Sequence, residues 1–297
     1  MQTRLTTAAA LTALTAMLAF VPAHANPNWD NVGEALGKKG AELPGGVYRV
    51  GLPRSDLKVT LDGVAIKPAL ALGSWLAFQA MGDSAMVMGD LVLTQDEVSP
   101  VMKRLAEGGI EITALHNHLL RAEPMTMYMH VEGHGDPVKM AEELHAALAL
   151  SKTPLGQSGS GGAAQTVDLD TAALDKALGH AGKVNGGVYQ FSIPRAESPT
   201  AGGMNVPTSM GTAIAINFQP TVGGKAAMTG DFVLIASEVN PVLQALRENG
   251  IEVTAIHNHM LNDQPRLFFM HFWANDDAGK LAQGLKAALD KVNLAKS

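Results

Sequence analysis

The feature that most constrains the fold of this chain is an internal duplication. His116-Asn117-His118 is followed by Met129-His130, and the same arrangement returns 141 residues later as His257-Asn258-His259 and Met270-His271. The flanking segments repeat at the same offset, with only small compensating length differences. We therefore expect two similar domains arranged as a pseudo-twofold pair, by analogy with isologous dimers.

Length and composition agree with two globular domains. A chain of 297 residues can bury two cores, and 46% hydrophobic residues against 17% charged residues favour a folded protein over a disordered one. A Gly/Ser-rich segment between the copies reads as a flexible linker. The predicted division is a leader at 1–25, a first α+β repeat at 26–150, the linker at 151–166 and a second α+β repeat at 167–297.

The first residues have the pattern of a secretory signal peptide. Arg4 precedes an apolar run from Ala8 to Val21, and Ala23-His24-Ala25 forms a cleavage site of the A-x-A type. A membrane anchor is the alternative, but this run is too short to span a bilayer. The pattern predicts a periplasmic or secreted protein with no membrane anchor after signal cleavage.

Two absences from the sequence narrow the choice of partner. The chain has no cysteine, which excludes disulfides and thiolate metal ligands, so the fold must depend on its core. The net charge is −6 and no basic block is present, so nucleic acid is not an expected partner. The oligomeric state is left open.

Each half is predicted to alternate helices with mostly antiparallel strands. In the first half the expected helices are Trp29–Lys39, one capped by Ser99 with Pro100 at its first position, and one from Asp136 to about Leu150. The expected strands are Val47–Leu52, Leu70–Gln79, Met86–Thr94, Ile110–Leu120 and Met125–Glu132. This order predicts the α+β class, with helices on one face of each sheet. The β-α-β-β-α portion would fit a ferredoxin-like arrangement.

Several short motifs occur in both halves. They are Gly-Gly-Val-Tyr, Pro-Arg, Gly-Asp, Glu-Val-(Ser/Asn)-Pro-Val and Gly-Ile-Glu-(Ile/Val)-Thr-Ala-(Leu/Ile)-His-Asn-His, followed by Met-His. On these motifs the chain resembles the bacterial family known as domain of unknown function 1259 (LppY/LpqO-like), over nearly all of the mature chain. The resemblance implies an exported two-repeat protein and supplies no reaction. The lipoprotein members carry a cysteine that this chain lacks, so their membrane anchoring is not implied.

The histidines of each copy are expected to share one strand face. Side chains alternate along a strand, so His116 and His118 point the same way, together with Ile110, Ile112 and Ala114. The opposite face would carry Glu111, Thr113, Leu115 and Asn117. With a three-residue turn at Ala122-Glu123-Pro124, His116 would lie opposite His130 and His118 opposite Tyr128. A turn with an even number of residues would place His130 on the other face.

Three imidazoles on one face predict a metal site in each repeat. Neutral imidazoles suit zinc or copper, and the local arrangement resembles that of carbonic-anhydrase-type sites. The predicted ligands are His116, His118 and His130 in the first repeat and His257, His259 and His271 in the second. The alternative is a set of core-edge histidines bonded to carbonyls or carboxylates. A Met125, Met127 and Met129 stripe could suggest copper, but Arg266 and Phe268 in the other copy favour core filling.

Matched acids and arginines could complete such a site. Asp90 and Asp231 could orient a histidine or act as a general base, or be turn residues. Arg54 and Arg195 are candidate ligand-binding residues, with ion pairing to the acids Glu97 and Glu238 as the alternative. Glu132 and His134, replaced by Trp273 and Asn275 in the second copy, make the first half the better candidate if only one half is active.

The leading hypothesis is an exported protein that binds zinc or copper through its duplicated histidine clusters. The alternatives are a protein that binds a small polar or anionic ligand and a metal-dependent hydrolase or lyase. A purely structural scaffold is the remaining reading. Whether the chain is an enzyme is not decided by sequence.

Overall fold

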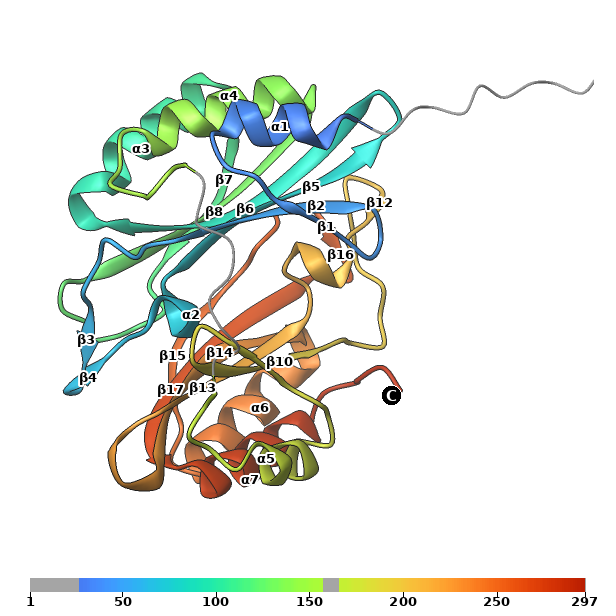
Figure 1. Cartoon of the computed structure of the whole chain (residues 1–297). Helices are drawn as coiled ribbons and strands as arrows, with labels where there is room; N and C mark the ends of the chain where they lie inside the picture. The colour runs from blue at the N-terminus through green and yellow to red at the C-terminus, as the bar shows by residue number, and fades with distance from the viewer. Residues whose placement is uncertain (1–26, 157–165, 297) are drawn as a thin grey trace, which may run out of the picture.

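The computed structural model describes residues 27–156 and 166–296 (Figure 1). Each repeat is a mostly antiparallel sheet covered on one face by helices, as predicted. The two sheets turn their other faces toward each other, so the molecule has four layers in the order helices, sheet, sheet, helices (Figure 1). The predicted leader and most of the predicted linker lie outside the described residues.

The first sheet has six strands, and every neighbouring pair is antiparallel. Their spatial order is β1 (Ala41–Leu43), β2 (Val47–Pro53), β5 (Gly73–Met81), β6 (Ser84–Thr94), β8 (Thr126–Gly135) and β7 (Glu111–His116). A short hairpin, β3 (Thr60–Leu61) and β4 (Val64–Ala65), and helix α2 (Pro68–Ala71) connect β2 to β5.

The second sheet repeats this order. Its strands are β9 (Lys183–Asn185), β10 (Val188–Ile193), β13 (Ile214–Pro220), β14 (Lys225–Ile235), β17 (Leu267–Asp277) and β15 (Glu252–His257). Between β10 and β13 the chain forms β11 (Thr200–Ala201), β12 (Met204–Asn205) and the 3₁₀ turn η1 (Thr208–Met210), and β11 also pairs with β16 (Asp263–Gln264). A further 3₁₀ turn, η2 (Val222–Gly224), precedes β14.

The helices form the two outer layers. The first repeat has α1 (Trp29–Leu36), α3 (Gln95–Glu107) and α4 (Pro137–Leu148), and the second has α5 (Thr171–Leu178), α6 (Ala236–Glu248) and α7 (Ala278–Leu289). None of the helices in residues 27–156 and 166–296 is long and apolar enough to span a membrane.

Helix α3 begins earlier than the sequence predicts. Its N-cap is Thr94 rather than Ser99, and Pro100 lies inside the helix. Glu97 accounts for the difference, because its carboxylate accepts a hydrogen bond from the Thr94 backbone N–H at 2.9 Å and completes a capping box. A cap with two reciprocal bonds therefore outcompetes the Ser-Pro signal. In α6 only one half of it recurs, because Glu238 accepts from the Ile235 backbone N–H at 2.9 Å while the isoleucine side chain has no acceptor.

A β-bulge in the histidine-bearing strand inverts its faces. The β7–β8 register shifts between Ile112 and Ala114, so Ile112 packs toward the helices while Ala114 lies opposite His130 on the inner face. The prediction that His116 and His118 share a face with Ile110 and Ile112 is therefore wrong, because a bulge adds one residue to one strand only. The same shift occurs between Val253 and Ala255 in β15.

Short connecting segments of each repeat form hydrogen bonds to the other repeat across the interface. The Gln219 side chain donates to the Ala65 carbonyl at 2.7 Å and accepts from the Lys67 backbone N–H at 2.9 Å. In the other direction, the Arg49 guanidinium donates to the Ser209 carbonyl of η1. Apolar side chains of both repeats close one end of the interface, and among them are Leu70, Leu119, Tyr128, Val188 and Trp273.

Candidate metal centre

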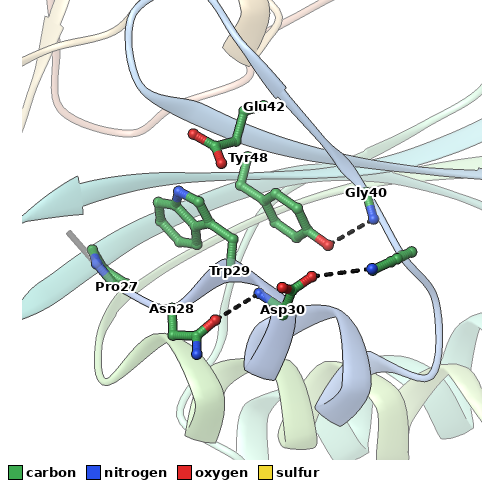
Figure 2. A pocket seen from close by; sticks show the side chains of 8 residues that line it. Pro27, Asn28, Trp29, Asp30, Gly40, Glu42 and Tyr48 are labelled. Atoms are coloured by element: carbon green, nitrogen blue, oxygen red, sulfur yellow. Dashed lines mark hydrogen bonds and ion pairs between the residues drawn. The ribbon is translucent and has the colours of Figure 1, made fainter.

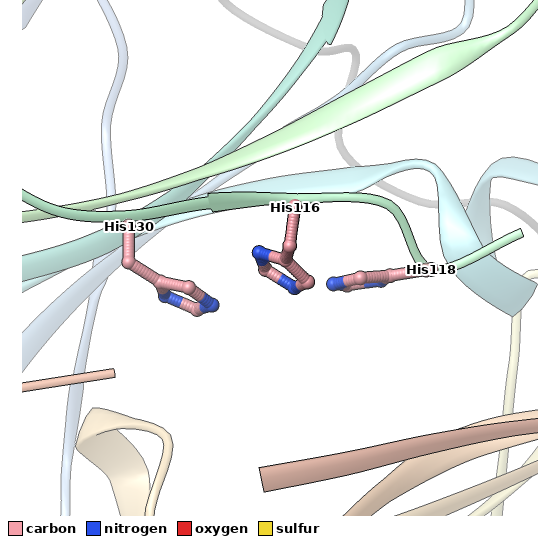
Figure 3. A group of neighbouring side chains, drawn as sticks. All are labelled: His116, His118 and His130. Atoms are coloured by element: carbon pink, nitrogen blue, oxygen red, sulfur yellow. The ribbon is translucent and has the colours of Figure 1, made fainter. Parts of the chain in front are cut away.

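The histidines of the first repeat project from the inner face of its sheet toward the second repeat. His116 ends β7, His130 lies on the neighbouring β8, and His118 follows in the loop after β7 (Figure 3). The loop returns through a cis Glu123–Pro124 peptide. The Asn117 side chain accepts a hydrogen bond from the Leu119 backbone N–H at 2.9 Å.

The predicted face is therefore right but the predicted register is not. His130 lies opposite Ala114, and His116 lies opposite Tyr128, two residues away from the predicted pairing. A longer loop replaces the predicted three-residue turn, because the chain between the strands pairs with β3 through a Thr60–Glu123 bridge. The shift is even, so all three rings still lie on the inner face.

The two histidine sets form one cluster rather than two separate sites. Three pairs of rings stack across the interface, and each pair has one histidine from the first repeat and one from the second. Their centroids are 3.6 Å apart for His116–His257, 3.6 Å for His118–His271 and 3.8 Å for His130–His259. The His116–His257 pair lies in the middle, with centroids of both other pairs about 5 Å away. The duplicated motifs thus meet on the pseudo-twofold axis.

Ligand-competent nitrogens converge in three overlapping groups within this cluster. In each group one nitrogen per histidine lies within 4.8 Å of the others. The groups are His116, His118 and His130; His116, His257 and His271; and His130, His257 and His259. Two of the three groups combine histidines from both repeats, and none consists of second-repeat histidines alone. The geometry therefore favours a centre shared by the repeats over a separate site in the second repeat.

Many polar atoms of this cluster are buried and have no hydrogen-bond partner in the described chain. They are Asp90 Oδ1, His116 Nδ1, His118 Nε2, His130 Nε2, Asp231 Oδ1, His257 Nδ1, His257 Nε2 and His259 Nε2. Buried polar groups in proteins are nearly always bonded, so such a concentration needs an explanation.

Burial keeps the imidazoles neutral. It lowers the pKa of His259 to about 3 and holds the pKa of His118 and His130 well below the ordinary value. Neighbouring histidines reinforce the effect on His118 and His130, because a second imidazolium in the cluster would repel the first. A neutral ring offers a lone pair for a metal ion without first losing a proton to become a ligand.

Asp90 and Asp231 lie against the rings. Asp231 Oδ2 is 3.3 Å from His259 Nε2, and Asp90 Oδ2 is 3.7 Å from His118 Nε2. Burial raises the pKa of Asp231 to about 6, and burial together with the Asp231 charge raises that of Asp90 well above its ordinary value. A nearby cation would reverse both shifts, because it stabilises the carboxylate form.

The arginines predicted as ligand-binding residues are ion-paired within their own repeats. All five N–H groups of Arg54 are engaged: Nε and Nη2 with Asp56, Nη1 and Nη2 with Glu97, and Nη1 with the Val92 carbonyl at 2.6 Å. Arg195 bonds Glu197 and Glu238 through Nη1 and Nη2, while its Nε has no partner in the described chain. The ion-pair alternative therefore describes them, since no donor of Arg54 is left for a ligand.

Glu132 and His134 continue the inner face of β8 beyond the ring cluster. Glu132 is buried, which raises the pKa of its carboxyl, and His134 Nε2 lies 3.9 Å from its Oε1. Neither residue belongs to the three nitrogen groups found in the described chain. In the second repeat, Trp273 replaces Glu132 and donates from Nε1 to Asp62 across the interface at 3.0 Å.

Sequence reasoning missed several residues that border the cluster. Arg49 lies over the Trp75 ring at 4.1 Å, and burial lowers the pKa of its guanidinium to about 10 although the Asp90 charge opposes this. Thr113, expected on the other face, donates from Oγ1 to the His259 carbonyl at 2.6 Å because the bulge turns it inward. The sequence could have pointed to Arg49, because the matching position after Gly-Gly-Val-Tyr in the second repeat is Gln190, and such a difference between the copies marks a residue specific to one half.

A separate surface hollow of about 530 Å³ lies beside α1 (Figure 2). Trp29 stacks on Tyr48 there with ring centroids 5.4 Å apart, and the Tyr48 hydroxyl accepts from the Gly40 backbone N–H at 2.7 Å. The polar groups that line it include the exposed Asp30–Lys39 ion pair at 3.2 Å. These are features of helix docking, and the histidine cluster is the better functional candidate.

The chain belongs to the family described as Domain of Unknown Function (DUF1259), whose family model matches residues 30–150 and again residues 172–291. The predicted family and its two repeats are thus confirmed. No curated protein matches the chain significantly.

Solved structures give only a distant likeness. A trimeric bacterial microcompartment shell protein, PduB, is 12% identical with a TM-score of 0.24, over 87% of this chain and 96% of that one. EtuB from Clostridium kluyveri is 10% identical with a TM-score of 0.20, over 85% and 90% of the respective chains. Scores of this size carry no argument about assembly or ligands.

Proposed function

We propose that this DUF1259 protein binds a transition metal, zinc or copper, between its two repeats and does so outside the cytoplasm, as its leader predicts. The ligands come from both copies of the duplicated motif. They are drawn from His116, His118, His130, His257, His259 and His271.

The observation that carries the proposal is the set of eight buried, unpartnered polar atoms in one cluster. Each such atom costs about 1–3 kcal/mol when it lacks a partner. Their sum is on the order of the whole stability of a typical domain, about 5–15 kcal/mol. A ligand that satisfies several of these atoms at once removes that cost.

The donor set selects the class of ligand. Neutral imidazole nitrogens suit zinc and copper, and ions that prefer oxygen, such as magnesium and calcium, lack enough oxygen donors in this cluster. Asp90 and Asp231 supply negative charge beside the rings, which offsets the charge of a divalent ion and can orient a histidine through its second nitrogen.

Elemental analysis of purified mature protein tests the proposal. His116 and His257 together belong to all three nitrogen groups, so the His116→Ala/His257→Ala variant disrupts every one of them. The wild type should retain zinc or copper after reloading and dialysis, and the variant should lose it. A matched variant, His134→Ala/His180→Ala, removes two histidines elsewhere and should bind as the wild type does. A metal-free wild type after reloading would refute the proposal.

A metal-dependent hydrolase or lyase is a second candidate, and one observation favours it. Burial raises the pKa of Asp231 to about 6, which brings this carboxyl near the range of a general base, and it lies 3.3 Å from His259 Nε2. Zinc-loaded protein assayed on esters and phosphoesters, with Asp231→Asn as the comparison, tests this reaction class. Equal rates for both proteins would exclude Asp231 as the base.

The alternative of an anionic-ligand protein loses its main support. It required Arg54 and Arg195 to face a ligand, and both guanidinium groups are occupied by carboxylates of their own repeat.

A further inference from the structure

One histidine of the cluster differs from the other five. Both ring nitrogens of His257 are buried and have no hydrogen-bond partner in the described chain. Its counterpart His116 has only Nδ1 in this state, because His116 Nε2 lies 3.3 Å from His271 Nε2. A neutral imidazole has one N–H donor and one lone pair, so His257 leaves both kinds of group unsatisfied.

His257 also connects the nitrogen groups. It belongs to the group with His116 and His271 and to the group with His130 and His259, and these two groups have no other member in common. Its ring centroid is 4.7 Å from that of His271 and 5.3 Å from that of His130. Two different sets of donors therefore lie near this one ring.

The outer ring pairs are separated by the central one. Within the described residues, ring contacts join His118 to His271 and His130 to His259, and none joins one of these pairs directly to the other. The planes of the outer pairs are inclined by 32° and 29°, against 19° for the central His116–His257 pair. One ion could thus lie between the central pair and His118–His271, and a second between the central pair and His130–His259.

We infer that the centre is dinuclear and that His257 is shared, with one ring nitrogen bound to each of two metal ions. The inference rests on the proposed metal binding. The two nitrogens of an imidazole point away from each other in the ring plane, so one ring can serve two ions and cannot chelate one. Binding of the second ion releases the ring N–H proton to solvent, and no electron is transferred.

The charges of the site can accommodate a second ion. The carboxylates of Asp90 and Asp231 balance one divalent ion, and the deprotonated His257 ring leaves a single net positive charge when the second binds. Both carboxylates are buried against the rings, and each has an oxygen without a hydrogen-bond partner. Buried carboxylates are costly unless a cation or donor pairs with them.

Copper(II) titration of metal-free protein, followed by electron paramagnetic resonance, tests the shared histidine. The wild type should bind two copper ions per chain, and the signal of the first ion should fall when the second binds, because two copper centres joined through one imidazole couple magnetically. The His257→Ala variant should lose this coupling. The control His180→Ala variant should keep it, because His180 belongs to none of the three nitrogen groups.

Each outcome decides a separate question. One uncoupled copper per chain in the wild type would overturn the dinuclear inference and leave the proposed metal binding intact, whereas no bound copper or zinc would overturn both. Two uncoupled ions, or coupling that survives His257→Ala, would show that His257 is not shared. Circular dichroism checks that each variant is folded, and if His257→Ala is not, the wild-type stoichiometry and signal decide alone.

Discussion

The protein contains two kinds of buried polar region, and their difference separates structure from function. Around Arg54, every guanidinium donor is bonded, to Asp56, Glu97 or the Val92 carbonyl. In the histidine cluster eight buried atoms have no partner in the described chain. Both regions are duplicated and both are buried. The Arg54 network is complete within the protein's own residues, and its copy around Arg195 leaves only Nε without a partner in the described chain.

The comparison explains why burial alone does not identify a site. The Arg54 network connects the end of β2 to the cap of α3, and Glu97 also accepts from the Lys152 backbone N–H at 2.8 Å. The network thereby holds β2, α3 and the chain after α4 in one arrangement. The histidine cluster lies where the two repeats meet. His271 Nδ1 donates to the Gly230 carbonyl at 2.8 Å, but the unpartnered nitrogens of the cluster lie near one another. An incomplete polar network of this kind is suited to receive a ligand.

Removing Arg54 should give the largest loss of stability. The Arg54→Ala variant leaves Glu97 as a buried carboxylate without its cation, which costs about 3–5 kcal/mol in the free energy of unfolding. Urea unfolding measures the loss, and Arg195→Ala should behave alike. Metal stoichiometry of the folded fraction should not change. A loss of metal without a loss of stability would place Arg54 in the ligand site instead.

Metal should stabilise the wild type and not the cluster variant. At free metal one hundred times the dissociation constant, the free energy of unfolding should rise by about 2.7 kcal/mol. The His116→Ala/His257→Ala variant should gain nothing, and its metal-free form should be no less stable than the wild type, because it lacks three unpartnered nitrogens. Thermal unfolding with and without chelator measures both. An equal metal-induced shift in the two proteins would contradict the account.

Acid should destabilise the metal-free protein through its histidines. Burial lowers the pKa of His259 from 6.5 to about 3, so between these values the unfolded chain binds more protons and stability falls as the pH falls. Asp231 acts in the opposite direction between 6 and 3.8, because burial raises its pKa to about 6. From pH 6.5 to 5.5, His259→Asn should remove about 1 kcal/mol of the loss, because the unfolded histidine is only half protonated at pH 6.5. Urea unfolding at both pH values measures it, and an unchanged loss would contradict the assigned environment.

An exposed ion pair between the repeats should have the smallest effect. Arg121 contacts Asp62 at 2.9 Å and Glu252 at 2.8 Å, but about half of its side chain is exposed. Surface pairs of this kind contribute about 0–1 kcal/mol. Arg121→Ala should therefore lower the free energy of unfolding by less than about 1 kcal/mol and leave metal binding unchanged. A loss of unfolding free energy as large as that of Arg54→Ala would contradict the expectation that an exposed ion pair contributes little to stability.

Local pattern was enough to predict much of the fold. The 141-residue offset gave the two repeats, and alternation placed His116, His118 and His130 on one face. Propensity could not predict the bulge between Ile112 and Ala114, because that depends on pairing with β8. The cap at Thr94 was hidden for a similar reason, since Glu97 is fixed there partly by Arg54, 43 residues away.

The merging of the two histidine sets depends on how the repeats dock. The sequence around His116 or His257 does not predict that their ring centroids lie 3.6 Å apart, because the contact forms only when the two sheets face each other. The expectation of one site in each half followed from treating each repeat alone. Duplication pointed to the six histidines, and only the assembled pair of sheets gives their arrangement.

Anomalous scattering from crystals grown with zinc, recorded on both sides of the zinc absorption edge, tests the central claim most directly. The account predicts a zinc peak between the two sheets, with nitrogens of histidines from both repeats about 2.0–2.1 Å away. A map without a peak there, in which the unpartnered nitrogens of His116, His257 and His259 bond only to water, would contradict it.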